Sequence, residues 1–312
     1  MLTELRVRSR ISPAAMEERR QKVMTERDYD VLLTGPTRVA APDGRPLAVY
    51  LPGAVKAQMD AAYPILTTIR GLTENRGYAS GTGEKFTQNN LQRAKPVMSS
   101  ILGSFESSGF YKFCRLTSWT RDELDTRWPE LYPLWQAIAA RFAEQVPDRF
   151  GVQMDFARQT APEWLIPGTP FTTVTVNNTF PTGVHKDQGD LESGFSCLAV
   201  ARRGAFTGGT LTFPEYRVAV DMADGDLILM DAHAWHGNTR MRCACGRELD
   251  GSVVVLEGKQ LADGPCPECG AERISVVLYY RTKMAACGTE PEEQAKAVEW
   301  GERWNRTSTP QS

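Results

Sequence analysis

Three side chains in the second half of the chain could hold a metal ion. His185 and Asp187 are separated by one residue in the string VHKD, and His236 follows the apolar stretch GDLILMD. Residues two apart on an extended segment point to the same side, so His185 and Asp187 can face one ion. Two histidines and one carboxylate are the ligand set of non-haem Fe(II) oxygenases. Because the chain has only 3 histidines, this pattern predicts an iron site more strongly than an isolated H-x-D would.

A candidate site for an anion lies further along the chain. Arg273 and Ser275 are again two apart, in the strand-like string RISVVLYY. A guanidinium binds a carboxylate through two parallel hydrogen bonds, and a hydroxyl adds another. The pair therefore predicts a site for the distal carboxylate of 2-oxoglutarate. The alternative is an edge-strand arginine that faces solvent.

Four of the 7 cysteines form two close pairs between these motifs. Cys243 and Cys245 are followed by glycine in CACG, and Cys266 and Cys269 are followed by glycine in CPECG. Four thiolates in two pairs suit tetrahedral zinc, although the cysteines of CACG are separated by one residue rather than by the two residues of CPECG. We expect a structural Zn(II) site here, with free thiols or a disulfide as the alternatives.

Short strands must position most of these side chains. From residue 171 onward the apolar, β-branched strings FTTVTVNN, FSCLAVA, GGTLTFP, YRVAVDM, GDLILMD, SVVVLEG and RISVVLYY alternate with turn residues. Regularly spaced short strands predict a β-sandwich or barrel. Apolar residues at helical spacing predict helices over 54–72 and 129–147, and a polar helix is expected over 289–312.

The ordered set of motifs resembles the TET/JBP group of 2-oxoglutarate- and Fe(II)-dependent dioxygenases of nucleic acids. The shared pattern runs from about 171 to 282, through VHKDQGDLESGFSC and FTGGTLTFPEYRVAVDMADGDLILMDAHAWHGNT to RISVVLYY. The resemblance implies a mainly β (α+β) fold with a double-stranded β-helix (jelly-roll, cupin-like) core and flanking helices. It also implies that His185, Asp187 and His236 bind iron and that Arg273 and Ser275 bind 2-oxoglutarate.

The same resemblance suggests where a substrate base would lie. Tyr279 falls where TET members place a tyrosine beside the flipped base, and ordinary packing is the alternative. Gly189 and Asp190 stand where TET members have a His-Asn pair that reads 5-methylcytosine, so the identity of the base stays open. Asn178 and Asp190 could read base edges. Their alternative roles are to end a strand and to cap a turn.

The implied reaction is hydroxylation, with O2, of the methyl group of a 5-methylpyrimidine in DNA. 5-Methylcytosine is favoured, and thymine is close behind. One alternative is a 2-oxoglutarate-dependent hydroxylase of a free nucleoside or another small molecule. The other is a catalytically silent, zinc-dependent nucleic-acid-binding protein.

Domain boundaries follow from the motifs. We expect an N-terminal region of helices and loops at 1–100 that packs on the core, and a dioxygenase domain at 101–286. A zinc-knuckle insertion at 240–272 and a C-terminal helix and tail at 287–312 complete the chain. The glycine-rich basic stretch 71–96 is expected to be a loop that grips phosphates through Arg76, Lys85, Arg93 and Lys95.

Composition excludes several classes of protein. The chain is 41% hydrophobic and 24% charged, which is the balance of a globular protein rather than of a disordered or fibrous one. No run of about 18 apolar residues predicts a membrane span, and the charged start does not resemble a secretory signal, so we expect a cytoplasmic protein of a bacterial or phage-infected cell. The net charge is −2, yet residues 1–100 hold 15 Lys and Arg against 10 Asp and Glu. This basic third could face an anionic partner, or could be ordinary solvated surface.

Overall fold

The computed structural model describes residues 2–73, 97–251, 253–256, 259–262, 266 and 268–307. The chain divides into two compact units, and each is built from separate stretches. The first unit comprises Met1–Ser100, Thr175–Gln188 and Ser196–Val277. The second unit comprises Ile101–Val174, Gly189–Phe195 and Leu278–Ser312. The loop 71–96 with its four basic residues lies outside the described residues from residue 74 onward.

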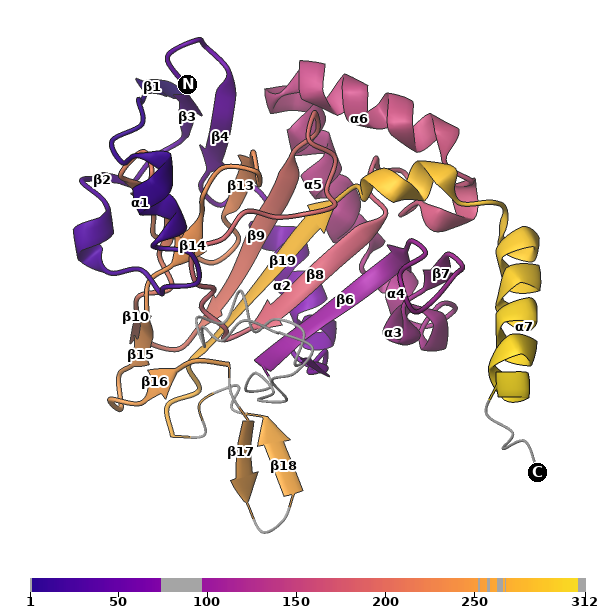
Figure 1. Cartoon of the computed structure of the whole chain (residues 1–312). Helices are drawn as coiled ribbons and strands as arrows, with labels where there is room; N and C mark the ends of the chain where they lie inside the picture. The colour runs from indigo at the N-terminus through magenta and orange to yellow at the C-terminus, as the bar shows by residue number, and fades with distance from the viewer. Residues whose placement is uncertain are drawn as a thin grey trace. The chain divides into compact units, whose positions relative to one another are not determined.

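A large sheet dominates the first unit (Figure 1). Its strands, in spatial order, are β1 (Thr3–Arg6), β3 (Thr37–Ala40), β4 (Pro46–Leu51), β13 (Leu227–Met230), β9 (Ser196–Arg203), β19 (Glu272–Tyr279), β8 (Thr173–Asn178), β6 (Val97–Phe105) and β5 (Leu72–Thr73). β6, β8 and β19 continue along the chain into residues of the second unit. Every residue of β8, β13 and β19 is buried, which explains why most of their residues are apolar or β-branched.

Smaller sheets complete the first unit. One has the order β14 (Gly237–Asn238), β11 (Leu211–Phe213), β12 (Val218–Val220) and β2 (Val31–Leu33); a second has the order β10 (Phe206–Thr207), β15 (Met241–Cys243) and β16 (Glu248–Leu249). β17 (Val253–Leu256) and β18 (Lys259–Ala262) form a separate hairpin. The helices are α1 (Pro13–Glu17), η1 (Glu26–Asp28) and α2 (Lys56–Leu66), and α2 packs against β9.

The second unit is mainly helical. Its elements are β7 (Arg115–Leu116), α3 (Ser118–Asp122), α4 (Arg127–Glu130), α5 (Tyr132–Gln145), α6 (Pro147–Gln159), η2 (Pro162–Trp164), η3 (Thr282–Ala286) and α7 (Glu290–Thr307). The fully buried Phe142 of α5 stacks on Phe171 and Phe195, with ring centroids 6.2 Å apart in both pairs. Cys114 and Cys287 form a disulfide that links positions 173 residues apart.

The expected mixture of sheets and helices is confirmed, with local differences. The helix expected over 129–147 is interrupted at Leu131 and continues as α5, which ends at Gln145. The helix expected over 54–72 ends at Leu66. The N-terminal region, expected to consist of helices and loops, also contains the five short strands β1 to β5 and the start of β6. β4 pairs with β13 and β3, and β2 pairs with β12. None of the described helices is both long and apolar enough to cross a bilayer.

Candidate active site

Two strand-like segments of the first unit bring the three candidate iron ligands together. His185 and His236 exchange backbone hydrogen bonds of 2.9 and 3.0 Å, and the backbone N–H of Asp187 donates to Ala232 at 3.0 Å. This antiparallel pairing fixes the two segments side by side. One nitrogen or oxygen from each of the three side chains lies within 4.8 Å of the others, so they could share one ion.

The ring hydrogen bonds of both histidines leave the same atom free for a metal. Nδ1 of His185 lies 2.8 Å from the carbonyl oxygen of Gly183, and Nδ1 of His236 lies 3.0 Å from that of Ala234. Since a carbonyl only accepts, each Nδ1 carries the proton, and each Nε2 presents a lone pair. Burial, followed by the neighbouring His185, lowers the pKa of His236 to about 4. The ring is therefore neutral near pH 7, which is the form that binds metals.

The carboxylate of Asp187 faces both of these Nε2 atoms. Its oxygens lie 3.3 Å from Nε2 of His185 and 3.9 Å from Nε2 of His236. His233, the third histidine, is not part of this group; its Nδ1 lies 3.6 Å from Asp231, and its side chain is partly exposed. The donor set is thus two neutral imidazoles and one carboxylate on one side, which fits Fe(II) with open positions.

An N-terminal segment that the sequence analysis missed supports both ligand-bearing segments. Gln21 donates its backbone N–H to Val184, Val184 donates back to Lys22, and Met24 donates to Asn238. The approach is so close that a Cβ atom on Gly183 would lie 2.4 Å from the carbonyl oxygen of Gln21. Glycine at position 183, two residues before His185, is the sequence signal that could have revealed this contact.

Arg273 is buried, and among the described residues its charge is only partly offset, by Asp221. Its side chain is on β19 and is 4% exposed, and its Nη2 has no hydrogen-bond partner among the described residues. Burial, and then the nearby Arg202, lower the pKa of Arg273 to about 10, so it stays charged near pH 7. A buried guanidinium without a partner is costly unless a ligand supplies the acceptor. Ser275, 3% exposed, lies two residues along the same strand. This arrangement fits the distal carboxylate of 2-oxoglutarate.

The three candidate substrate residues have different surroundings. Asn178 is fully buried at the end of β8, where its amide donates to Glu272 at 2.8 Å and its oxygen accepts from Thr179, as a strand-end role would require. Asp190 pairs through its backbone with Arg281, and Tyr279 is the buried last residue of β19. Both of these belong to the second unit. The structure therefore groups neither of them with Asn178.

A buried carboxylate next to Arg273 was also missed by the sequence analysis. Glu272 has no exposed side-chain surface, and it accepts hydrogen bonds from Tyr63 at 2.5 Å and from Thr67 and Asn178. These donors come from α2, the turn after it and β8. Glu272 thus fixes the start of β19, the strand that carries Arg273.

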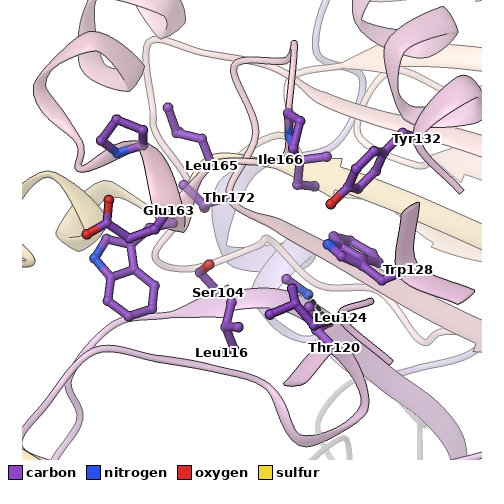
Figure 2. Close-up of a pocket in the computed structure, with 14 residues that line it drawn as sticks. Ser104, Leu116, Thr120, Leu124, Trp128, Tyr132, Glu163, Leu165, Ile166 and Thr172 are labelled. Atoms are coloured by element: carbon purple, nitrogen blue, oxygen red, sulfur yellow. Dashed lines mark hydrogen bonds between the residues drawn. The ribbon is translucent and has the colours of Figure 1, made fainter. Parts of the chain in front are cut away.

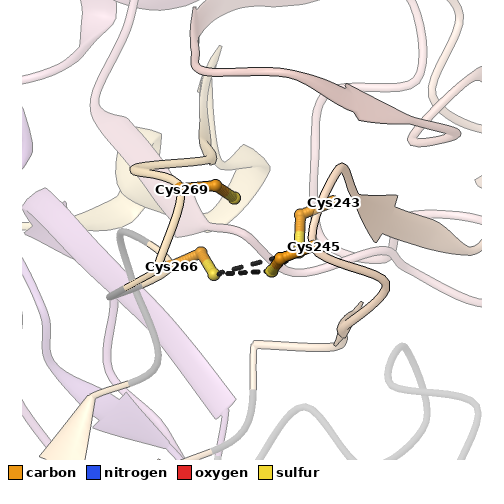
Figure 3. A group of neighbouring side chains, drawn as sticks. All are labelled: Cys243, Cys245, Cys266 and Cys269. Carbon is orange, nitrogen blue, oxygen red and sulfur yellow. Dashed lines mark hydrogen bonds between the residues drawn. The ribbon is translucent and has the colours of Figure 1, made fainter.

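The four cysteines of the two pairs form one cluster in the first unit (Figure 3). Sγ of Cys266 lies 3.8 Å from Sγ of Cys243 and 3.5 Å from that of Cys245, and the last two are 2.8 Å apart. Four sulfurs about 2.3 Å from a zinc ion would be separated by about 3.8 Å. Burial opposes ionisation of Cys266, but backbone N–H groups of Glu268 and Cys269 bring its pKa down to about 7. The two distances from Cys266 are close to this value and the Cys243–Cys245 distance is about 1 Å shorter, so the four clustered thiols favour a zinc ion by their chemistry more than by their spacing.

The second unit encloses a cavity of about 120 Å³ that contains none of the predicted site residues (Figure 2). Its walls include Leu116, Trp128, Tyr132 and Ile166. Two further lining residues are joined by a hydrogen bond, in which the backbone N–H of Gly103 donates to the hydroxyl of Thr120. No residue that lines this cavity is a candidate ligand of a metal or of 2-oxoglutarate, and those candidate ligands all belong to the first unit.

Comparison with known proteins gives sequence relatives and a structural neighbour. Thymine dioxygenase JBP1 of Leishmania braziliensis is 30% identical over 190 residues, which are 60% of this chain and 20% of that protein. Thymine dioxygenase JBP1 of Trypanosoma brucei brucei is 32% identical over 179 residues, or 57% and 18% of the two chains. The chain therefore matches about one fifth of the length of these relatives. The structure titled NgTET1 in complex with 5mC DNA superposes with a TM-score of 0.55 at 13% identity, covering 89% of this chain and 88% of that one.

The structural likeness establishes the fold, and a family model establishes the family. The superposition confirms the expected double-stranded β-helix of the TET oxygenases, with flanking helices. The family model Tet_JBP, described as the oxygenase domain of the 2OGFeDO superfamily, matches residues 106–282, which is more than half of the chain. Proteins of this superfamily use Fe(II) and 2-oxoglutarate. The chain belongs to the Tet_JBP family of 2-oxoglutarate- and Fe(II)-dependent oxygenase domains.

Proposed function

We propose that the protein hydroxylates the 5-methyl group of a pyrimidine in DNA, with Fe(II) held by His185, Asp187 and His236. The observation that carries the proposal is the buried guanidinium of Arg273, whose Nη2 has no hydrogen-bond partner among the described residues, in the same unit as the His-Asp-His group. Fe(II) with 2-oxoglutarate and O2 supplies the oxidising chemistry that an unactivated methyl group requires. With Ser275, Arg273 would bind the distal carboxylate of 2-oxoglutarate and orient it.

The other residues of the site prepare the metal position. The carbonyls of Gly183 and Ala234 hold both imidazoles in the tautomer that presents Nε2. Backbone pairing of His185 with His236 sets the spacing of the two rings. Ligands that are oriented before the metal arrives lose little freedom on binding it. The four cysteines would hold a structural zinc ion that fixes the loop before β19.

The substrate class rests on the relatives. The two JBP1 proteins are named thymine dioxygenases, and the TET neighbour was solved with 5mC DNA. Both names point to a methylated pyrimidine in DNA. We propose this class for the present chain, with thymine and 5-methylcytosine as the two bases to be compared. A base in a duplex must be rotated out of the stack before its methyl group can reach the metal.

The test is to incubate the protein with Fe(II), 2-oxoglutarate and O2 and to analyse the nucleosides of the DNA by mass spectrometry. One duplex carries 5-methylcytosine with uracil in place of thymine, and another carries thymine with unmodified cytosine. We expect 5-hydroxymethylcytosine, 5-hydroxymethyluracil or both, together with succinate. A duplex with uracil and unmodified cytosine has no 5-methyl group and should give no product.

Substitutions connect the product to the site. His185→Ala and Asp187→Ala should abolish the product, while His233→Ala, which changes the histidine outside the group, should retain it. Full activity of either ligand variant would refute the iron site. Succinate formed with a free nucleoside but never with DNA would favour the small-molecule hydroxylase. DNA binding without any succinate would favour the silent nucleic-acid binder.

A further inference from the structure

The first unit has an open groove of about 500 Å³ that none of the assignments above uses. It runs between the start of the chain, where β1 is an edge strand of the large sheet, and the turn that connects β11 to β12. Tyr216, Val31 and Val7 contribute apolar surface to the groove. Four arginines also line it: Arg6, Arg8, Arg10 and Arg217.

Two of these arginines are only partly compensated, and the charge of Arg10 helps to lower the pKa of Asp30 after the hydrogen bond from Arg217. Arg217 is neutralised by two hydrogen bonds to Asp30, at 2.6 and 2.7 Å, and Arg6 pairs with Glu4. The exposed side chains of Arg8 and Arg10 make no hydrogen bond or ion pair with any residue that the structure describes. The groove lining contains four arginines and one aspartate, so it carries a net positive charge, which attracts an anionic partner.

We infer that this groove binds phosphates of the DNA backbone beside the base that the site would oxidise. The inference rests on the proposed function, and it names the surface that holds the duplex. Guanidinium groups bind phosphate through paired hydrogen bonds, and such contacts position a protein on DNA without reading its sequence. The apolar side chains between the arginines would pack against the deoxyribose.

The groove is linked to the metal site by direct contacts within the first unit. Glu215, next to the groove residue Tyr216, accepts a hydrogen bond from the backbone of Arg10. Arg45 lies beside Tyr216 and forms an ion pair of 2.5 Å with Asp231. Asp231 begins the loop that ends at His236, and this loop also accepts the backbone hydrogen bond of Asp187. The groove and the iron ligands are thus connected through Tyr216, Arg45 and Asp231.

Fluorescence anisotropy of a labelled duplex measures this contact. The complete protein, with Fe(II) and 2-oxoglutarate and without O2, is titrated at salt concentrations between about 50 and 200 mM. Loss of two phosphate contacts should make the slope of log K against log salt less steep by about 1.8 in Arg8→Gln/Arg10→Gln. The control Arg141→Gln/Arg158→Gln removes two exposed arginines of α5 and α6 and should leave the slope unchanged.

Each result has a defined meaning. A reduced slope in the groove variant alone supports the inference. An unchanged slope, or an equal reduction in both variants, overturns it, even where the nucleoside assay shows product and the proposed function stands. Wild-type protein that binds no duplex also overturns it. If polyglutamate displaces the labelled duplex as effectively as unlabelled DNA does, the groove would be assigned to an acidic protein segment, and the inference would also be overturned.

Discussion

At the scale of single residues, Arg273 is the side chain whose surroundings demand a ligand. It is buried on β19 and charged, and its Nη2 lacks an acceptor in the described part of the protein. The distal carboxylate of 2-oxoglutarate would complete the hydrogen bonding of the guanidinium.

Replacing Arg273 should therefore weaken the binding of 2-oxoglutarate specifically. A hydrogen-bonded charge contact contributes about 1.5–3 kcal/mol, so Arg273→Gln should raise the KM for 2-oxoglutarate by about 10- to 150-fold. Binding of 2-oxoglutarate to the Fe(II) protein without O2, followed by absorption spectroscopy, should weaken in parallel. Arg242→Gln, an exposed arginine on β15, is the matched control. An unchanged KM in Arg273→Gln would remove the assignment.

At the scale of elements, the contact between the N-terminal segment and the metal-bearing segments should matter for iron. Gly183→Ala would place a Cβ atom 2.4 Å from the carbonyl oxygen of Gln21, so one of the two backbones must move. We expect weaker Fe(II) binding, measured by equilibrium dialysis, and a lower unfolding temperature.

Gly151→Ala is the matched control for this change. Gly151 lies in α6, where a Cβ atom meets nothing within 4 Å. Alanine is preferred to glycine inside a helix by about 1 kcal/mol, so this variant should be as stable as the parent or more stable. Iron affinity equal to wild type in Gly183→Ala would show that the N-terminal segment does not support the metal site.

The cysteine cluster joins β15 to the start of β19, so its ion should stabilise this connection. Cys266→Ser should reduce bound zinc, measured by elemental mass spectrometry, from about one ion per chain to none, because structural zinc sites need all four ligands. Cys197→Ala changes a buried cysteine of β9 outside the cluster and should keep the zinc. If the wild-type protein, purified under reducing conditions, contains no bound zinc, the assignment is contradicted.

At the scale of the whole molecule, the second unit is assembled from three stretches of chain, and one covalent link ties two of them. Cys114 and Cys287 are 173 residues apart in sequence. A crosslink between distant positions restricts the unfolded chain, which typically stabilises a protein by about 2–4 kcal/mol. Cys114→Ser should lower the free energy of unfolding by about this amount in urea titrations without reductant. Equal stability of variant and parent there would show that the link contributes nothing.

The sequence predicted what local patterns determine. The strands from residue 171 onward, the helix that ends near residue 145 and the C-terminal helix α7 follow from periodicity. The two-residue spacing in RIS matches β19, which carries both Arg273 and Ser275, whereas His185 and Asp187 lie outside the strands, with His185 in an isolated bridge to His236. β3 and β4 were missed because they are short and lie between Pro and Gly turns, and the pairing of β4 with β13 depends on residues about 180 positions away.

Features that depend on tertiary contacts could not be predicted in this way. The pairing of Cys114 with Cys287 has no local signature. The lack of a partner for Arg273 becomes visible only once the neighbouring strands are in place. The alternation of arginines in RVRSR was visible in the sequence, but the groove it faces is formed by the distant turn before β12.

The position of β19 has a consequence for how the protein is made. This strand lies between β9 and β8, yet it is translated 94 residues after β8 ends. At about 5–20 residues per second, the nascent chain waits roughly 5 to 20 s with two half-sheets whose facing edges are unpaired. Such edges readily pair with other chains. Chaperones that bind the growing polypeptide should therefore act during this interval. A chain released before residue 272 should aggregate.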